Sequence, residues 1–453
     1  MDSLLGVMIL GKTTISPPSG SVRSTTIPLT TFDLMGYPYP PVERLFLYSI
    51  LSCSESVFLK THVTTLKHSL SLTLRRFFPF AGKFLPTDSA GSFSSNPILS
   101  YTEGDGVDFI VAKSDRDFDE LSSHYPREIK TFAGLVPKLT QGVLAIQVTL
   151  FPDNGIGVGV IYHHGVADGL SSMHFVKTWA AFSRLGGTTV ESTEVDVEVP
   201  CIDRNKFPEP PEFAEGLEES RAGLKGKMIN DEGFRKRFFD LMARSDSVRA
   251  TLVVTRVELE NLRRKIVSNA SSPPSTYLSG FTLTTAILWK CMVSLYDDDD
   301  DKNEFVGFNL LSNYRSQQSS MFPNNYFGNC IIPGVVKMRR DELVGEEGLM
   351  KAAVAINEAI QIMKAKMKVV DYTNISAMFA VVGAPMLGVY KVDFGWGRPT
   401  KVEVMSVRNA WCMSLAENRD EENGGGFEIG GVFLSIDKFE EFKKLFLDLA
   451  ITA

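Results

Sequence analysis

The chain has 453 residues, of which 44% are hydrophobic and 22% are charged, and this balance allows large buried cores. Its formal net charge of −7, without any block of basic residues, gives no support for binding to nucleic acid or to an anionic membrane. The five cysteines lie far apart with no metal-ligand or redox spacing, and no run approaches the roughly 20 apolar residues that span a bilayer. We therefore expect a cytosolic protein with reduced thiols.

The predicted elements mix strands and helices along the whole chain. The apolar stretch 4–10 follows Asp2 rather than a basic residue, so it predicts a first β-strand and not a signal peptide. Apolar periodicity predicts helices, and β patterning predicts strands, without the regular alternation of a doubly wound sheet. The helices are expected over residues 63–74, 173–182, 255–266, 349–363 and 439–449, and two of the strands over 249–254 and 430–435.

Three of these helices carry capping signals at one end. Gly186-Gly187 is expected to close the helix over 173–182. Thr255 and Glu258 have the spacing of a capping box, and Asp437 is the expected cap of the last helix.

A β-hairpin is the most clearly patterned part of the chain. Residues 145–151 alternate apolar and polar side chains, and residues 157–162 are apolar enough to lie in an interior. Between them, Pro152-Asp153-Asn154-Gly155 supplies a tight turn, in which Asn-Gly is expected to take the positive φ angles.

One change of composition divides the chain into two halves of similar size. Residues 191–227 are polar, acidic and rich in proline, which is typical of a crossover linker. We therefore expect an N-terminal domain over residues 1–190 and a C-terminal domain over residues 228–453. The five aspartates at 297–301 and the stretch 418–426 are predicted to be exposed loops, since calcium loops space their ligands and interpose glycine.

Histidines gather directly after the hairpin. Three of the six lie within twelve residues, and two are adjacent in the run His163-His164-Gly165-Val166-Ala167-Asp168-Gly169. A histidine at the mouth of a buried strand is held rigidly, as a proton-transfer group must be. From the spacing alone, a buried histidine followed by a helix N-cap is the simpler explanation of His164 and Asp168. Metal binding is disfavoured, because adjacent side chains on an extended strand point to opposite faces and no other ligand cluster accompanies them.

Two further motifs favour a functional over a purely structural explanation of His164 and Asp168. They are Tyr326-Phe327-Gly328-Asn329-Cys330 in the middle of the chain and Asp393-Phe394-Gly395-Trp396-Gly397 near its end, with supporting segments at 29–33 and 79–83. Together with His164-x-x-x-Asp168-Gly169, these runs resemble the plant BAHD acyltransferases, which use coenzyme A thioesters, over essentially the whole chain. The Tyr-Phe-Gly-Asn-Cys run resembles the branch that acylates anthocyanins, flavonoids and other phenolic glycosides.

The resemblance implies a mixed α/β (α+β) fold of two chloramphenicol acetyltransferase-like domains, each a mixed sheet flanked by helices, with a channel between them. It implies that His164 is the general base, which takes a proton from the hydroxyl and returns it to the leaving thiolate, with no acyl-enzyme. Asp168 is then structural and pairs with Arg315, although Asn313 stands where relatives usually carry an acid. Asp393 and its motif are implied to be mainly structural, shaping the second half around the coenzyme channel.

The resemblance also implies an acyl-coenzyme A donor, with malonyl-coenzyme A preferred, a monomer, and neither a permanent cofactor nor a metal. Gly383-Ala384-Pro385 replaces the Thr-Ser-Trp group of shikimate-type relatives, which disfavours a shikimate or quinate acceptor. A hydroxycinnamoyl donor, a free alcohol or amine acceptor, and a non-catalytic scaffold are the alternatives.

The phosphates of coenzyme A require basic or amide donors. Arg264 and Lys265, beside Arg263, lie on the helix that Thr255 opens, and a cationic surface run is the competing explanation. Ser279 and Thr282 precede another helix whose positive amino end could face a phosphate.

Overall fold

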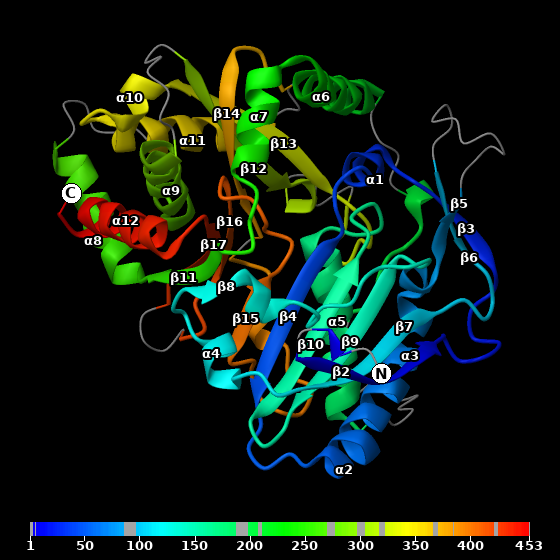
Figure 1. Ribbon diagram of the computed structural model, residues 1–453. Helices are drawn as coiled ribbons and strands as arrows, with labels where there is room; N and C mark the ends of the chain where they lie inside the picture. Colours follow the sequence, from blue (N-terminus) through cyan, green and yellow to red (C-terminus); the bar gives the residue numbers. More distant parts are fainter. Residues whose placement is uncertain are drawn as a thin grey trace.

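Two seven-stranded mixed sheets organise the chain in the computed structural model (Figure 1). The structure describes residues 3–452 except 5, 86–96, 187–197, 207–210, 270–276, 297–303, 317–321, 366–369, 384 and 421–424. The five consecutive aspartates therefore lie outside the described residues.

The first sheet belongs mainly to the N-terminal half. In spatial order its strands are β1 (Ser3–Leu4), β2 (Val7–Ile15), β7 (Val107–Ser114), β9 (Leu144–Phe151), β10 (Gly155–Tyr162), β4 (Val42–Ser49) and β15 (Lys401–Val404). Helices α3 (Thr64–Arg76) and α5 (Gly169–Arg184) pack together and contribute to its core. A smaller sheet of β3 (Thr25–Pro28), β6 (Ile98–Tyr101) and β5 (Lys83–Leu85) lies beside it.

The second sheet belongs mainly to the C-terminal half. Its strands, in spatial order, are β13 (Ile331–Arg339), β12 (Phe305–Asn313), β14 (Ile375–Val382), β16 (Cys412–Glu417), β17 (Phe427–Phe433), β11 (Val248–Val254) and β8 (Arg127–Glu128). Its core includes residues of α8 (Arg256–Asn269), α9 (Gly280–Tyr296), α11 (Gly348–Ala365) and α12 (Ile436–Leu447). The remaining helices are α1 (Thr31–Gly36), α2 (Glu55–Val57), α4 (Phe118–Ser122), α6 (Pro211–Asn230), α7 (Glu232–Asp240) and α10 (Arg340–Val344).

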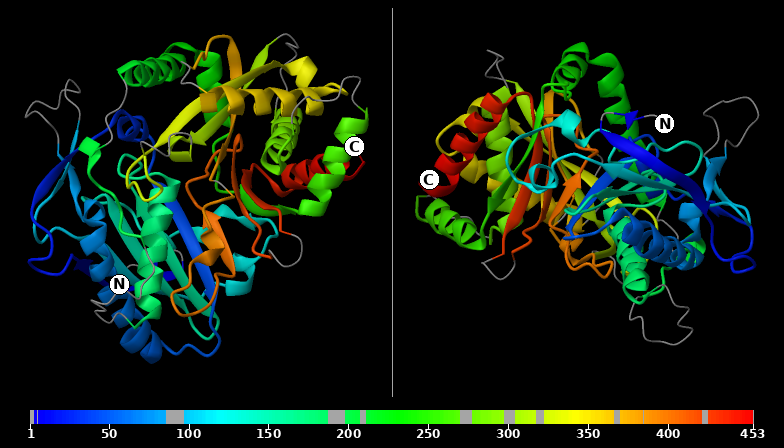
Figure 2. Two further views of the ribbon diagram at one scale, coloured as in Figure 1. Left: turned by 180° about the vertical axis from the view of Figure 1, so that it is seen from behind. Right: turned by 60° about the horizontal axis from the view of Figure 1, so that its bottom comes forward.

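The two halves exchange strands. β15 comes from the C-terminal half but pairs antiparallel with β4, and β8 comes from the N-terminal half but pairs with β11. Figure 2 shows the orange strand β15 beside the blue strand β4. Each sheet is therefore completed by the other half of the chain, which fixes the halves relative to each other.

The predicted hairpin forms as β9 and β10, with residues buried along both strands. Burial along the whole length of both strands fits a sheet covered on its two faces. The expected turn geometry is wrong in detail: the positive φ of 61° belongs to Asp153, and neither Asn154 nor Gly155 has one.

Other predicted boundaries shift by a few residues. The first long strand, β2, runs over Val7–Ile15 rather than 4–10, and β17 ends at Phe433. The last helix is capped by Ser435, whose hydroxyl accepts from the Lys438 amide, and not by Asp437. Within the predicted linker, residues 211–227 lie in helix α6, which contacts α1. None of the helices in the described ranges is long and apolar enough to cross a membrane.

Candidate active site

The histidine run forms the turn between β10 and α5. Asp168 caps α5, because its Oδ1 accepts a hydrogen bond of 2.9 Å from the Ser171 amide. The side chain is fully buried, so its charge must be compensated within the protein.

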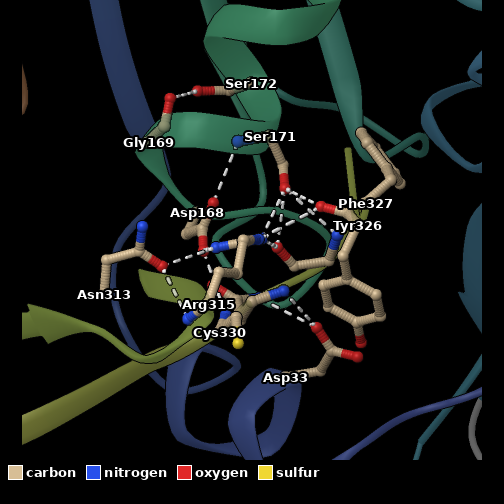
Figure 3. Close-up of polar contacts among 12 residues, drawn as sticks. Asp33, Asp168, Gly169, Ser171, Ser172, Asn313, Arg315, Tyr326, Phe327 and Cys330 are labelled. Atoms are coloured by element: carbon tan, nitrogen blue, oxygen red, sulfur yellow. Dashed lines mark hydrogen bonds and ion pairs between the residues drawn. The ribbon is translucent and has the colours of Figure 1, made fainter. Parts of the chain in front are cut away.

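Arg315 provides that compensation from the turn after β12 (Figure 3). Its Nη1 lies 2.6 Å from Asp168 Oδ2, and the Cys330 amide donates to the same oxygen at 2.9 Å. Arg315 Nη2 donates to the Ser171 hydroxyl and the Gly328 carbonyl, both at 2.9 Å. Burial is the largest single influence on the pKa of Arg315 and lowers it, but attraction to Asp168, Cys330 and Tyr326 and the hydrogen bond to Asp168 together outweigh burial and raise that pKa.

Asn313, at the position where the resemblance to the family predicts an acid, also takes part. Its side-chain oxygen accepts from the Arg315 backbone amide at 3.1 Å and from Arg315 Nη1 at 3.3 Å. A neutral amide therefore fills this position, and it orients Arg315 without adding a second negative charge.

A second buried ion pair, which the sequence did not predict, lies beside the first. Arg204 Nε lies 3.3 Å from Asp33 Oδ2, and both side chains are almost fully buried. Asp33 Oδ1 accepts from the Asn329 backbone amide at 2.8 Å, and Arg204 donates to the Phe327 carbonyl. From the sequence, Asp33 belongs only to the supporting segment 29–33, and Arg204 belongs only to the predicted linker.

The segment 326–330 joins these two ion pairs. Tyr326 lies between the guanidinium groups of Arg204 and Arg315, which are 5.4 and 5.3 Å from its ring centroid. Phe327 packs instead into the core of the first half, 5.1 Å from Phe80. The segment is therefore held in both halves of the molecule.

His164 receives its support from this same segment. The Asn329 side-chain amide donates to the His164 carbonyl at 2.8 Å and also to Asp33 Oδ1 at 3.1 Å. Gly36, at the end of α1, packs so closely that a Cβ there would lie 2.9 Å from His164 Nδ1. The half-buried ring makes no hydrogen bond to any described residue, and its Nδ1 is buried. Nε2 is therefore the nitrogen that can face a substrate.

His163 has different surroundings. Its Nδ1 accepts from the Gly165 amide at 3.1 Å, and its ring packs against Tyr37 and Phe84, with centroids 5.0 and 4.7 Å away. Burial, and then the neighbouring His164, lower the pKa of His163. Of the two adjacent histidines, His163 is engaged in packing and His164 keeps an unoccupied ring nitrogen.

The Asp393–Gly397 loop lies at the opposite end of α5. Its Phe394 carbonyl accepts from Ser183 near the end of that helix, whose 16 residues put its two ends roughly 24 Å apart. Asp393 Oδ1 accepts from the amides of Gly395 and Gly397, both at 2.8 Å, and both glycines have positive φ. The loop is thus remote from His164.

Aromatic packing fixes this loop to the first half. Phe394 contacts Trp179, and half-buried Trp396 packs on Tyr48 and donates to His62 Nδ1 at 3.1 Å. The described contacts thus hold the residues before β15 against the first half of the chain. That the motif also shapes the second half around a coenzyme channel stays a prediction.

The candidate coenzyme residues lie on α8 and at the start of α9. Arg264 is exposed and bonds to Asn261 within its own helix, and Lys265 is partly exposed. Ser279 caps α9 through the Thr282 amide at 3.1 Å, and its hydroxyl also lies 2.9 Å from the hydroxyl of fully buried Thr282. Contact of these four residues with coenzyme A stays a prediction, and buried Thr282 is the least accessible of them.

The third clustered histidine does not join the other two. His174 lies on α5, where its Nε2 bonds to the Glu198 carbonyl at 2.8 Å. Within the described ranges, no group of three or more His, Cys, Asp or Glu residues is placed to hold a metal ion.

The fold and the arrangement of residues around His164 are those of an acyltransferase, and comparison with known proteins assigns the chain to a family. A model of the transferase family matches residues 5–448, so the chain belongs to this family, that of the BAHD acyltransferases. In overall fold it matches vinorine synthase, with 17% identity, a TM-score of 0.69 and 98% of each chain covered. It also matches F. graminearum TRI101 in complex with coenzyme A and deoxynivalenol, with 14% identity, a TM-score of 0.63, and 93% of this chain and 98% of the other covered.

Curated relatives cover nearly the same length. A malonyl-coenzyme A:anthocyanin 3-O-glucoside-6''-O-malonyltransferase of Dahlia pinnata is 32% identical over 99% of this chain and 98% of its own. A coumaroyl-CoA:anthocyanidin 3-O-glucoside-6''-O-coumaroyltransferase of Arabidopsis thaliana is 33% identical over 95% of both chains. A phenolic glucoside malonyltransferase of Nicotiana tabacum is 32% identical over 88% of this chain and 90% of its own.

Proposed function

We propose that the protein transfers an acyl group, preferentially malonyl, from its coenzyme A thioester to a sugar hydroxyl of an anthocyanin, flavonoid or other phenolic glycoside. The catalytic part rests on His164: Asn329 holds its backbone carbonyl, while neither ring nitrogen has a hydrogen-bond partner among the described residues. The glycoside acceptor and the malonyl donor rest on the names of the Dahlia and tobacco relatives.

In this mechanism His164 acts as the general base. A sugar hydroxyl is barely ionised at neutral pH, so Nε2 takes its proton as the oxygen attacks the thioester carbonyl, a contribution of roughly 10²–10⁴-fold in rate. The tetrahedral intermediate then collapses, the carbon–sulfur bond breaks, and the imidazolium returns the proton to the leaving thiolate. Asp168, paired with Arg315, holds the turn that carries the base and does not orient the imidazole.

Direct transfer without an acyl-enzyme fits the state of the cysteines. Burial raises the pKa of Cys330 and of Cys412 to about 12 each, and it raises that of Cys291 as well. A thiol at such a pKa supplies almost no thiolate at neutral pH, and the thiolate is the nucleophilic form. The state of these three cysteines supports direct attack by the alcohol.

A hydroxycinnamoyl donor is the second candidate, because the coumaroyl-transferring relative is as similar as the malonyl-transferring ones. We further propose that the enzyme acts as a monomer in the cytosol, where its five free cysteines would stay reduced.

A matrix of donors and acceptors tests the proposal. The purified chain is supplied with malonyl-, acetyl- or p-coumaroyl-coenzyme A, together with a flavonoid glucoside, the matching aglycone, shikimate or a polyamine. We expect product from malonyl-coenzyme A and the glucoside only. Product from the aromatic donor alone would reverse the order of donors. Acylation of the aglycone, shikimate or polyamine would contradict the glycoside acceptor, and thiol release that persists in His164→Ala would contradict the base.

A further inference from the structure

A narrow cavity lies where the two halves meet, apart from the cluster around Asp168. Strands β4 and β15 of the first sheet, strands β11, β16 and β17 of the second, and the residues Gly383, Leu387 and Val389 contribute its walls. Its lining includes four charged residues, Arg44, Lys401, Glu403 and Glu428. Leu387, also in the wall, would lie 3.3 Å from a Cβ on Gly169, so the cavity is next to the first residue of α5.

Arg44 is the unusual residue of this cavity. It is only 6% exposed, yet its side chain has no hydrogen bond or ion pair with any described residue. Arg44 also borders a second cavity, which Tyr162 and Ser172 help to line, and the groups that act electrostatically on its guanidinium are Tyr162 and Glu417. The hydroxyl of Thr251 in the wall of the first cavity is also buried without a partner. Buried groups of this kind are costly unless something pairs with them.

The carboxylates nearby are already engaged. Glu403 lies 2.8 Å from Arg127 and 3.8 Å from Arg249, while Glu428 lies 2.8 Å from Lys401. Glu428 also accepts from the Tyr390 hydroxyl at 2.7 Å and is 3.9 Å from His124.

Glu417 is the remaining acid within electrostatic range of Arg44, but it lies beyond ion-pair distance. Burial raises its pKa, which disfavours the charged form. Its other cationic neighbour, Lys177, donates to the Leu387 carbonyl. The charged residues of the lining therefore balance, with Arg44 and Lys401 against Glu403 and Glu428. Both acids are already ion-paired, which leaves Arg44 as the cation of the lining without an ion pair to a described residue.

We propose that this cavity binds a carboxylate group, with the Arg44 guanidinium as its main partner and the Thr251 hydroxyl as a second donor. This assignment rests on the proposed function, in which the carboxylate is the free end of the malonyl donor. A free carboxylate from solution is the other possible source of the same group. The space in the cavity is about 20 Å³, on the order of one or two water molecules. A carboxylate that displaces this water would fit better than an aromatic ring, so Arg44 would favour malonyl over hydroxycinnamoyl donors.

The test uses the full chain, Arg44→Met, which removes the charge at similar length, and Arg44→Lys, which keeps a cation. Melting temperatures are measured with sodium malonate, sodium acetate and sodium chloride at equal ionic strength. KM values are measured for malonyl- and p-coumaroyl-coenzyme A. We expect malonate to raise the melting temperature of the wild type and of Arg44→Lys but not of Arg44→Met. The KM for malonyl-coenzyme A should rise about tenfold or more in Arg44→Met, as for a lost charged hydrogen bond, with that for the coumaroyl donor unchanged.

The outcomes separate the possibilities. Malonate stabilisation that depends on Arg44, with both KM values unchanged, supports a site for free carboxylate. No carboxylate-dependent shift in the wild type together with an unchanged malonyl KM in Arg44→Met overturns the proposal, and points to a water-bridged pair with Glu417. If the wild type uses neither donor, the proposed function fails, while the melting measurements on the unmodified chain still decide whether the site exists.

Discussion

The two ends of helix α5 are each held by an aspartate, but the surroundings of the two aspartates differ. At the amino end, Asp168 is fully buried and pairs with Arg315 from the other half of the chain. At the carboxyl end, Asp393 is partly exposed and accepts hydrogen bonds from the amides of its own loop, and aromatic rings make most of the contacts. His164, the proposed base, lies beside the first end only.

This difference shows that the fold uses one kind of contact to position the turn of His164 exactly and another kind to hold strand β15 in place. Ion pairs and charge-assisted hydrogen bonds are directional, so the cluster of Asp33, Asp168, Arg204 and Arg315 fixes the turn that carries His164. Aromatic contacts depend less on exact orientation, which suffices where the loop has only to hold β15 against β4. Variants at the two ends should therefore fail in different ways.

The largest effect is expected from Asp168→Ala. It leaves Arg315 buried without its partner, which costs about 3–5 kcal/mol in the free energy of unfolding. Folded yield and activity should fall together, as measured by denaturant unfolding and by assay of the soluble fraction. Asp393→Ala is the matched control and should lose less, because water reaches its side chain. An unchanged melting temperature for a well-folded Asp168→Ala protein would refute the structural role of this pair.

A smaller and more selective effect is expected from Gly36→Ala. The new methyl group would lie 2.8 Å from the His164 carbonyl oxygen and 2.9 Å from Nδ1, so the histidine must shift. A displacement of this kind can lower kcat per folded molecule roughly 10²-fold. Because the nearest atom belongs to the backbone, the overpacking should also cost about 1–3 kcal/mol of stability. Gly11→Ala is the control, since nothing lies within 4 Å of a Cβ there. If Gly36→Ala kept the wild-type kcat, exact placement of the imidazole would not matter.

At the far end of α5, Trp396→Ala should affect stability alone. Loss of its packing on Tyr48 and its hydrogen bond to His62 should cost about 1–3 kcal/mol. Thermal unfolding checks this, and kcat per folded molecule should remain that of the wild type. Trp396→Phe keeps most of the packing and should lie in between. A fall in kcat without a fall in melting temperature would assign the loop to the chemistry.

Much of the local structure could be predicted from the sequence. The hairpin β9–β10, helix α5 after the histidine run, and the capping box of α8 depend on patterns within a few residues. Where two capping residues compete over short distances, as Ser435 and Asp437 do, the pattern does not fix which one the backbone uses.

Contacts between distant segments could not be predicted in this way. The pair of Asp33 with Arg204 joins residues 171 positions apart, and no periodicity marks either side chain as buried. The Thr30–Asp33 spacing is that of a capping box, which could have located the start of α1 but not its ionic partner. The pairing of β15 with the first sheet could not be predicted either. A strand pattern of four residues is compatible with the edge of any sheet, so it does not identify the partner strand.

The most direct test of the account is the rate of acyl transfer to a glucoside by His164→Ala, measured beside its melting temperature. We predict a loss of roughly 10²–10⁴-fold in kcat with an unchanged melting temperature, because the ring makes no hydrogen bond to the described protein and serves the substrate alone. Acyl transfer at the wild-type rate by a folded His164→Ala protein would contradict the account.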